Sequence, residues 1–298
     1  MTYLLVGIGE LLWDIFPTGK ELGGAPANFT YHASALGGQG LIISSVGNDN
    51  LGNEMLERLG TLALSCQYVA RDIEHPTGTV SIKVGAGGEP SYRIKENVAW
   101  DFIPQTEQLM ELVQKVKAIT FGTLAQRSEV SRATVQAFVS QAPSDALCIF
   151  DINIRQAFYS REVIEWSLEA CNVLKLNEGE LQLLARLLSM EGDELQHLYS
   201  LSKRFNLELI ALTKGAEGSI LYSSEGVFIH EGYKTRVVDT VGSGDSFTAA
   251  LALGMLTGSD LGTTSDYANY VSSLVCSRRG ATPSLPEDLK IGRWLKSL

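Results

Sequence analysis

Residues 237–256 read VVDTVGSGDSFTAALALGML. A short β-branched run leads to Asp239, two glycines flank Ser243, and a small-residue apolar segment begins directly after Asp245. This order predicts a strand that turns through glycines into a helix. The first turn of a helix has unpaired backbone N–H groups and the positive end of the helix dipole, so it favours an anion such as phosphate.

Asp245 has two interpretations at this turn. As an N-cap or first-turn acid it would stabilise the helix by about 0.5–2 kcal/mol. Alternatively, the amides of residues 242–245 hold a phosphoryl group while Asp245 takes the proton of the group that attacks it. An ordinary aspartate, with a pKa of about 3.9, is ionised at neutral pH and can act as such a base.

Composition excludes several classes of protein. The chain has 298 residues, is 45% hydrophobic and has a net charge of −10, with no Lys/Arg block of the kind that binds nucleic acid. The sequence has no run of 18 apolar residues, so no membrane span is predicted, and its N-terminus lacks the basic region of a signal peptide. The four cysteines show no metal-binding spacing, so we expect reduced thiols and a cytoplasmic protein.

Short apolar runs alternate with helical patterns along most of the chain. Strands are predicted at 3–9, 40–46, 117–122, 146–152, 171–176 and 207–213, and helices near 25–36, 51–60, 105–116, 131–141, 160–170, 193–205, 245–257 and 265–279. This alternation is typical of an α/β domain whose mostly parallel sheet is covered by helices on both faces. We expect one domain over residues 1–298.

Two hairpins interrupt the alternation. Residues 79–96 are predicted to form one, with Val80, Ile82 and Val84 on a common apolar face. A two-stranded ribbon is not stable alone, so we expect insertions at about 10–22 and 76–100 to form a small β-sheet lid. The second hairpin, at 219–231, is expected at the edge of the main sheet.

Six segments resemble motifs of the PfkB, or ribokinase-like, carbohydrate kinases. LGGAPANFTYHASALGG (22–38) and DTVGSGDSFTAAL (239–251) resemble the two family signatures, and GTLAQR (122–127), DINIR (151–155), NEGE (177–180) and TKGAEGS (213–219) resemble the motifs between them. The resemblance spans nearly the whole chain and is strongest to bacterial fructokinases. It implies a ribokinase-like three-layer α/β/α fold and an ATP-dependent kinase that phosphorylates a sugar hydroxyl.

The resemblance makes Asp245 the general base and the amides of Gly242, Ser243, Gly244 and Asp245 the anion hole. Ser243 stands where the family usually has alanine, which leaves the backbone amide unaffected. The sugar pocket that the resemblance implies contains Asp14, Gly24, Asn28, Tyr92, Arg93, Arg127, Arg155 and Asp245.

Each of these polar residues also has a structural interpretation. Asn28 can orient a sugar through its amide or cap a helix. Asp14 either accepts hydrogen bonds from sugar hydroxyls or is a solvated acid at the root of the lid. The arginines bind hydroxyls, clamp the carboxylate of a sugar acid, or, for Arg93 and Arg127, are surface charges.

The nucleotide site that the resemblance implies contains Asn177, Glu180, Thr213, Gly215, Gly218, Gly242, Gly244 and Asn269. Asn177 and Glu180 lie one helical turn apart, and the resemblance implies that they bind Mg²⁺, mainly through water molecules. The same spacing is typical of a capping box. A K⁺ site behind the anion hole would use Asp239, Val241, Val275, Arg278, Gly280 and Ser284.

Several functional questions are open at this stage. D-Fructose, converted to fructose 6-phosphate, is the first substrate hypothesis, and a 2-keto-3-deoxygluconate-type sugar acid is the second, because QAF (156–158) departs from the typical fructokinase continuation. A catalytically silent binding protein is the hypothesis from another class. A homodimer through the lid is expected, unless the apolar lid face covers the chain's own sugar site.

Overall fold

The computed structural model describes residues 2–84 and 90–296, with the backbone alone at residues 82–84, 90 and 91. Within this part of the chain, the main sheet has nine strands in the order β13-β12-β11-β10-β9-β8-β1-β4-β5. They are β1 (Leu4–Ile8), β4 (Gln39–Gly47), β5 (Val69–Asp72), β8 (Ala118–Phe121), β9 (Leu147–Asp151), β10 (Val173–Asn177), β11 (Leu209–Thr213), β12 (Ser219–Ser223) and β13 (Gly226–His230). All neighbours pair in parallel except β11–β12 and β12–β13, so the predicted edge hairpin at 219–231 is confirmed.

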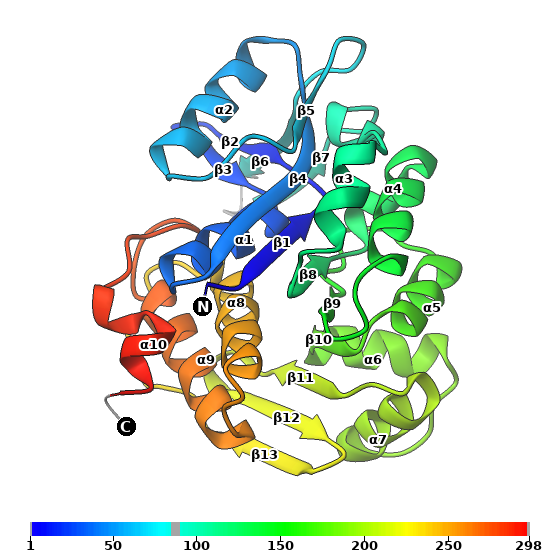
Figure 1. Cartoon of the computed structure of the whole chain (residues 1–298), viewed down its shortest axis with the longest axis vertical. Helices are drawn as coiled ribbons and strands as arrows, with labels where there is room; N and C mark the ends of the chain where they lie inside the picture. The colour runs from blue at the N-terminus through cyan, green and yellow to red at the C-terminus, as the bar shows by residue number, and fades with distance from the viewer. Residues whose placement is uncertain (1, 85–89, 297–298) are drawn as a thin grey trace.

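Helices cover both faces of this sheet (Figure 1). One layer contains α1 (Ala25–Ala35), α8 (Ser243–Leu256), α9 (Leu261–Cys276) and α10 (Ile291–Trp294), and the other contains α3 (Glu107–Val113), α4 (Glu129–Ser140), α5 (Arg161–Ala170), α6 (Glu178–Leu187) and α7 (Glu194–Phe205). Four short 3₁₀ helices, η1 (Ala99–Phe102), η2 (Leu124–Arg127), η3 (Gly215–Glu217) and η4 (Glu287–Leu289), lie in connections of the described chain. The predicted three-layer α/β/α architecture is therefore confirmed.

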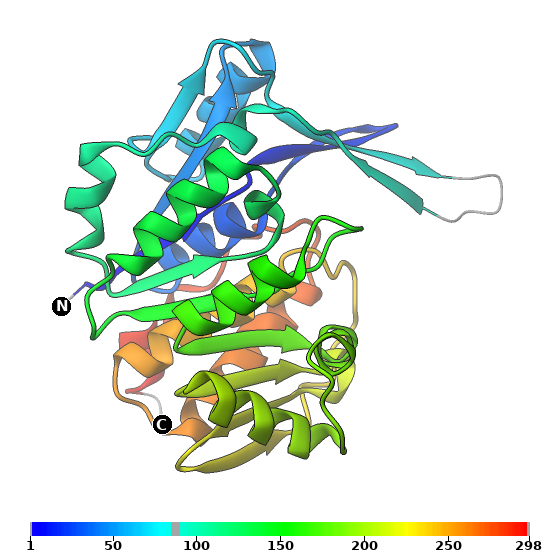
Figure 2. The ribbon, with the colours of Figure 1, turned by 90° about the vertical axis from the view of Figure 1, so that its right-hand side faces the viewer.

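A separate four-stranded sheet has the order β3-β2-β6-β7. Its strands are β2 (Leu12–Phe16), β3 (Gly19–Gly23), β6 (Gly78–Val84) and β7 (Pro90–Ile94), and Figure 2 shows it projecting from the body. Val80 is buried against Leu12, Ile94 and Trp100 of the same chain. The side chains of Ile82 and Val84 lie outside the described residues, so the expected dimer face stays a prediction. The helix α2 (Asn50–Thr61) packs near the root of this lid sheet.

Three local predictions are wrong or incomplete. Val237 and Val238 form no strand: both are exposed, and the amide of Val238 donates to the carbonyl of Cys276 at the end of α9 (2.8 Å) instead of to a sheet. The strand β5 and the helix α6 were not expected. The strand β5 has only four residues, and α6 begins at Glu178, directly after the last residue of β10, so no turn residues separate these two elements.

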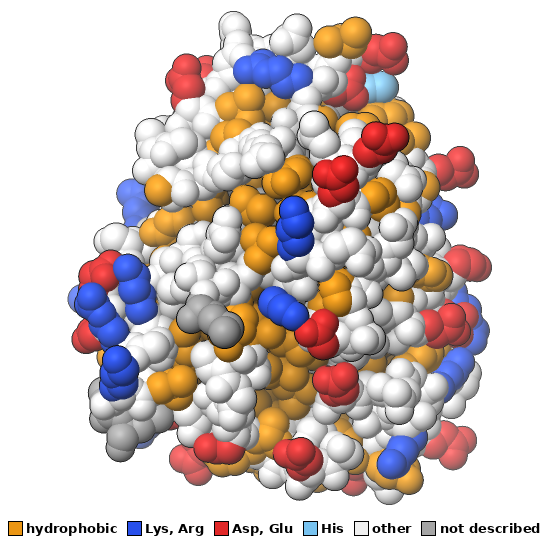
Figure 3. Space-filling view, viewed as in Figure 1, with side chains coloured by type: hydrophobic (Ala, Val, Ile, Leu, Met, Phe, Trp, Pro, Cys, Tyr) orange, Lys and Arg blue, Asp and Glu red, His pale blue; other side chains and the backbone are white. Residues whose placement is uncertain are grey.

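Charged side chains of both signs are interspersed on one face of the molecule. On the face drawn in Figure 3, the Lys and Arg side chains lie in small groups beside acidic ones, and no continuous basic patch forms. Across residues 2–84 and 90–296, none of the helices has the length and apolar character needed to cross a bilayer.

Two glycine-to-alanine substitutions should have opposite effects on stability, because Gly40 in β4 packs closely against α1 whereas Gly60 in α2 has open space beside it. A Cβ at Gly40 would lie 2.2 Å from the carbonyl oxygen of Thr30, so Gly40→Ala should lower the free energy of unfolding by about 1–3 kcal/mol. A Cβ at Gly60 in α2 meets nothing within 4 Å, so Gly60→Ala should raise it by up to about 1 kcal/mol. Urea unfolding of both variants checks this, and a Gly40→Ala protein as stable as the parent would contradict it.

Candidate active site

The glycine turn before α8 has the geometry of an anion hole. Gly242 is the N-cap, with φ of 77°, and a Cβ there would lie 2.5 Å from the carbonyl oxygen of Ala281, so only glycine fits. The amide of Ser243 already donates to Thr240 (3.3 Å). Among the described residues the amides of Gly242, Gly244 and Asp245 donate to no protein oxygen. These three donors are the ones that the turn leaves for an anion.

Asp245 lies against the other signature segment. Its Oδ2 accepts a hydrogen bond from Asn28 Nδ2 at 2.8 Å, so the first turns of α1 and α8 meet although they are 217 residues apart. Burial raises the pKa of Asp245 to about 6, and the charge of Asp151 acts in the same direction, while Asn28, Lys175 and Arg155 lower it. Asp245 therefore remains a usable base at neutral pH but loses its charge in mild acid.

Gly24 and Glu10 shape the start of α1. Gly24 is the N-cap with φ of 113°, and a Cβ there would lie 2.4 Å from the carbonyl oxygen of Glu10. The carboxylate of Glu10 accepts a hydrogen bond from the amide of Ala25 at 3.2 Å. Burial raises the pKa of Glu10 to about 7. The sequence analysis did not single out Glu10, and its signal is an acid within an otherwise buried apolar stretch.

A buried ion pair lies behind Asp245. Lys175 Nζ is 3.1 Å from Asp151 Oδ1, and Thr248 Oγ1 donates to Asp151 Oδ2 at 3.2 Å. Burial opposes the charge of Lys175, but Asp151, Glu180 and Asp245 together hold its pKa above the ordinary value. A Cβ at Gly244 would lie 3.1 Å from this ammonium, so Lys175 lies beside the anion-hole turn. Sequence reasoning missed Lys175, although a lysine inside an apolar strand is itself a signal.

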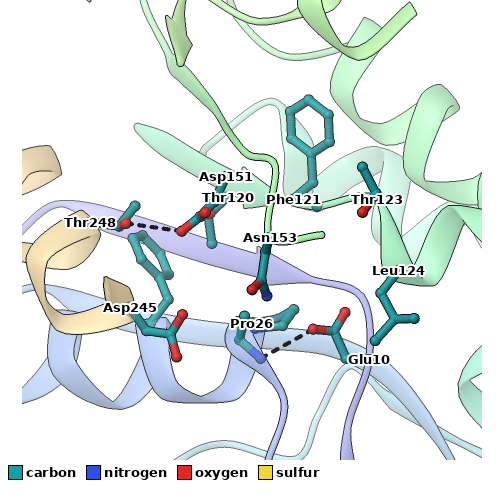
Figure 4. Close-up of a pocket in the computed structure, with 13 residues that line it drawn as sticks. Glu10, Pro26, Thr120, Phe121, Thr123, Leu124, Asp151, Asn153, Asp245 and Thr248 are labelled. Carbon is teal, nitrogen blue, oxygen red and sulfur yellow. Dashed lines mark hydrogen bonds between the residues drawn. The ribbon is translucent and has the colours of Figure 1, made fainter. Parts of the chain in front are cut away.

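Next to Asp245 there is a small cavity (Figure 4) at the carboxyl ends of β1, β8 and β9. Ligands bind at this edge in parallel α/β sheets. Its polar lining consists of Glu10, Thr120, Thr123, Asp151, Asn153, Asp245 and Thr248. No lysine or arginine is among the described residues that line it. The cavity therefore offers hydrogen-bond acceptors and hydroxyl groups.

The predicted sugar residues are only partly brought together. The charge of Arg155 lowers the pKa of Glu10, Asp14 and Asp245, so this exposed side chain lies near all three. Burial raises the pKa of Asp14 to about 6, although Arg155 opposes the shift. Tyr92 is exposed on β7, as is Arg93, and neither lines the cavity.

The DINIR segment departs from the predicted alternation. Its strand, β9, ends at Asp151, and Asn153 has a left-handed φ of 46°, so these side chains do not alternate toward one face as far as Arg155. Asn153 nevertheless lines the cavity together with Asp151.

Arg127 has a different environment from either prediction. Its Nε and Nη2 donate to the two carboxylate oxygens of Asp101 at 2.8 and 2.9 Å, and Nη2 also donates to the carbonyl of Lys95 at 2.6 Å. The guanidinium lies over the rings of Trp100 and Phe158. The side chain is 8% exposed, so the alternative of a surface charge is wrong, and Arg127 lies outside the cavity lining.

The Asn177–Glu180 pair forms the capping box at the start of α6. Asn177 Oδ1 accepts from the Glu180 amide at 3.0 Å, and Glu180 Oε2 accepts from the Asn177 amide at 2.8 Å. Glu180 Oε1 accepts from the amide of Ile154 at 3.0 Å, and burial raises the pKa of Glu180. No group of three or more His, Cys, Asp and Glu residues in the described chain is arranged to hold a metal.

The remaining nucleotide candidates lie near the ends of β11 and β12. Gly215 and Gly218 have positive φ, and a Cβ at Gly218 would lie 2.0 Å from the carbonyl oxygen of His230. Thr213 Oγ1 donates to the carbonyl of Leu176 at 3.3 Å. Asn269 is buried and donates to Ser219 Oγ and to the carbonyl of Ser265, both at 2.8 Å, so it joins α9 to β12.

The candidate K⁺ residues link two loops. Asp239 accepts from the amides of Val241 (3.1 Å) and Gly280 (3.0 Å), which holds the loop after α9 against the anion-hole turn. One of the proposed carbonyl ligands has a partner, because the carbonyl of Val275 accepts from the Arg278 amide at 3.0 Å. The proposed ligand of Ser284 is its hydroxyl, and the carbonyl of the same residue accepts from the Arg278 side chain.

The whole chain can be compared with known proteins. The model of the pfkB family carbohydrate kinases matches residues 10–288. The chain belongs to this family. It is 30% identical to the sugar kinase PH1459 of Pyrococcus horikoshii, over 96% of this chain and 95% of that protein, and 28% identical to a fructokinase of Escherichia coli, over 94% and 95%.

Solved relatives agree with the fold. The structure of PH1459 in complex with ATP covers 95% of each chain with a TM-score of 0.80 and 28% identity. A ribokinase II of E. coli, solved with ATP and Mg²⁺, has a TM-score of 0.81 at 21% identity and covers all of both chains. This member of the PfkB family is accordingly a sugar phosphotransferase with a ribokinase-like fold.

The raised pKa of Glu10 predicts a pH-dependent stability difference. Because the folded pKa of about 7 exceeds the ordinary value of 4.5, its contribution is fully present below about pH 4.5 and is lost as the pH rises through 7. Glu10→Gln removes this loss. The change that the substitution causes in the free energy of unfolding should therefore be about 3 kcal/mol more stabilising at pH 8 than at pH 4.5.

Urea unfolding at the two pH values measures this difference. Glu111→Gln, which changes an exposed acid on α3, is the matched control and should show no such dependence. Equal effects of Glu10→Gln at both pH values would contradict the environment assigned to Glu10.

Proposed function

We propose that this kinase transfers the γ-phosphoryl group of ATP to D-fructose, giving fructose 6-phosphate and ADP. The observation that carries the proposal is the position of Asp245. It lies on the unpaired first turn of α8, accepts from Asn28, and lines a cavity rich in hydrogen-bond acceptors. The identity of 28% to the E. coli fructokinase supports the choice of sugar.

In the proposed reaction Asp245 accepts the proton of the sugar hydroxyl as its oxygen attacks the γ-phosphorus. The new P–O bond forms while the bond to the leaving ADP oxygen breaks. The amides of Gly244 and Asp245 and the ammonium of Lys175 would stabilise the charge on the transferred group. Because these groups are fixed by packing and by the Asp151 pair, they need little reorganisation during the reaction.

Mg²⁺ fits the donors at the Asn177–Glu180 end of this site. Asn177 is exposed, and each oxygen of Glu180 already accepts one backbone amide, which suits an ion that retains most of its water. When bound, Mg²⁺ would neutralise phosphate charge. K⁺ near Asp239 is part of the proposal, supported by the contact between the two loops that Asp239 holds together.

Charge at the cavity favours a neutral sugar over a sugar acid. Glu10, Asp151 and Asp245 line it, whereas neither Arg93 nor Arg155, the two arms of the carboxylate clamp expected for a sugar acid, is among the described residues of the lining. Arg155 would instead bind hydroxyls. The carboxylate of a sugar acid would be repelled by the ionised forms of Glu10 and Asp245.

We also propose that the protein is a homodimer and is located in the cytoplasm. A homodimer through the lid is supported by the projection of that sheet from the body. A cytoplasmic location is supported by the four free cysteines, since burial raises the pKa of the Cys148 thiol to about 11 and that of Cys171 further, which suits inert reduced thiols.

Substrate preference can be measured by ADP release with Mg-ATP and a panel of fructose, glucose, ribose, 2-keto-3-deoxygluconate and adenosine. We expect the highest kcat/KM with fructose, by tenfold or more over the sugar acid. A preference for the sugar acid would overturn the fructose assignment and leave the kinase assignment intact. Absence of turnover with every acceptor would favour the silent binding protein.

Asp245→Asn should lower turnover by about 10²–10⁴ while ATP binding persists, because the base is lost and the amides remain. In the parent enzyme kcat/KM should fall about tenfold per pH unit below about pH 6, since only the ionised Asp245 acts as a base. Steady-state kinetics from pH 5 to 8 measures both effects. Asp288→Asn, which alters an exposed acid in η4, is the matched control. Near-parental turnover of Asp245→Asn would exclude the base assignment.

A further inference from the structure

Glu10 is an acid in an unusual position. It lies between β1 and β2, only 4% of its surface is exposed, and the apolar side chains of Ile8 and Leu11 on either side of it in the sequence are fully buried. An ionised carboxylate in such surroundings is costly unless it is paired or hydrogen-bonded. The mechanism above does not use Glu10, so its burial has no role in the phosphoryl transfer as described.

The hydrogen bonds of Glu10 leave capacity for a ligand. The amides of Ala25 and of Glu10 itself interact with its carboxylate, whereas a carboxylate has about four lone-pair sites. In Figure 4 the carboxylate of Glu10 lies at the same cavity as Asn153 and Asp245. A sugar hydroxyl in this cavity would face the carboxylate of Glu10, and the cavity is shared with Asp245.

The charges that face Glu10 come from three elements. Arg155, on the loop after β9, favours the ionised form, and Asp245 on α8 opposes it. Asp151 at the end of β9 lines the same cavity. The first turn of α1 contributes no acid, and β8 with the residues that follow it contributes Thr120 and Thr123. Near neutral pH the Glu10 carboxyl group of the sugar-free enzyme is therefore about half protonated and half ionised.

We propose that Glu10 is a substrate-contacting residue whose carboxylate, at the wall of the cavity beside Asp245, accepts a hydrogen bond from a sugar hydroxyl. Sugar binding should then expel the proton that part of the free enzyme carries on Glu10. This proposal rests on the proposed function, because the sugar must occupy the cavity beside Asp245. The expelled proton passes to the buffer, and the bound form keeps Glu10 ionised. Sugar affinity accordingly rises as the pH increases through neutrality.

Proton release at pH 7 distinguishes Glu10 from its neighbours. With a pKa of about 7, Glu10 is about half protonated there, whereas Asp14 and Asp245, with pKa values of about 6, are each about nine-tenths ionised. Hydrogen bonding to a hydroxyl favours the charged form of a carboxyl group. Binding should then release about half a proton per sugar from Glu10 and about a tenth from each aspartate.

Calorimetric titration of the full chain with D-fructose, without nucleotide, in two pH 7 buffers of different ionisation enthalpy measures this number. We expect release of about 0.5–0.7 protons by the parent and at most about 0.2 by Glu10→Gln, with about tenfold weaker binding. Gln keeps an acceptor for the Ala25 amide and should not impair folding. Glu111→Gln should behave as the parent.

Two results would overturn the proposal: a parent enzyme that releases no more than about 0.2 protons, or Glu10→Gln that releases as many as the parent. If the ADP assay instead selects another sugar, the fructose assignment fails and the titration is made with that sugar. Release that depends on Glu10 would then support the role of Glu10, and its absence would exclude it.

Discussion

The hydrogen bond between Asn28 and Asp245 joins the two ends of the chain at the point where chemistry is expected. It requires α1 and α8 to lie side by side on one face of the sheet, with both first turns at the carboxyl ends of the strands. Each helix begins at a glycine that allows no side chain, because a Cβ at Gly24 or Gly242 would clash with the carbonyl oxygen of Glu10 or Ala281, respectively. The anion hole, the base and the cavity are all positioned by this one junction.

Burial of charge is the second constraint on the site. The carboxylate of Asp151 is paired with Lys175 and accepts a hydrogen bond from Thr248. Glu10, Asp14 and Asp245 are compensated less completely, and burial raises the pKa of each. Such uncompensated acids lower stability at neutral pH, which is the usual consequence of reserving polar groups for a ligand.

Much of the fold follows from local patterns, because apolar strands and amphipathic helices depend on near neighbours in the sequence. Asp245 and Gly242 were predictable from their turn, and Asn28 from its motif. Glu10 and Lys175 were not, since their roles depend on burial and on charges brought from other elements. The position of Arg127 also depends on a partner, Asp101, that no motif connects with it. Val237 and Val238 have strand-forming side chains but find a helix end as their hydrogen-bond partner.

The arrangement of α1 between β1 and the late helix α8 has a consequence for biosynthesis. Residues 25–35 leave the ribosome long before residues 243–256, yet α1 buries Phe29 and Ala33 in a cluster that α8 and α9 complete. Long-range contacts of this kind form slowly and leave apolar surface open until the partner arrives. A nascent or C-terminally truncated chain therefore exposes this face of α1, which makes it a target for chaperones and for aggregation. The helix α8, which brings Asp245 and the anion-hole turn to the site, is thus also the helix that completes the apolar cluster around α1.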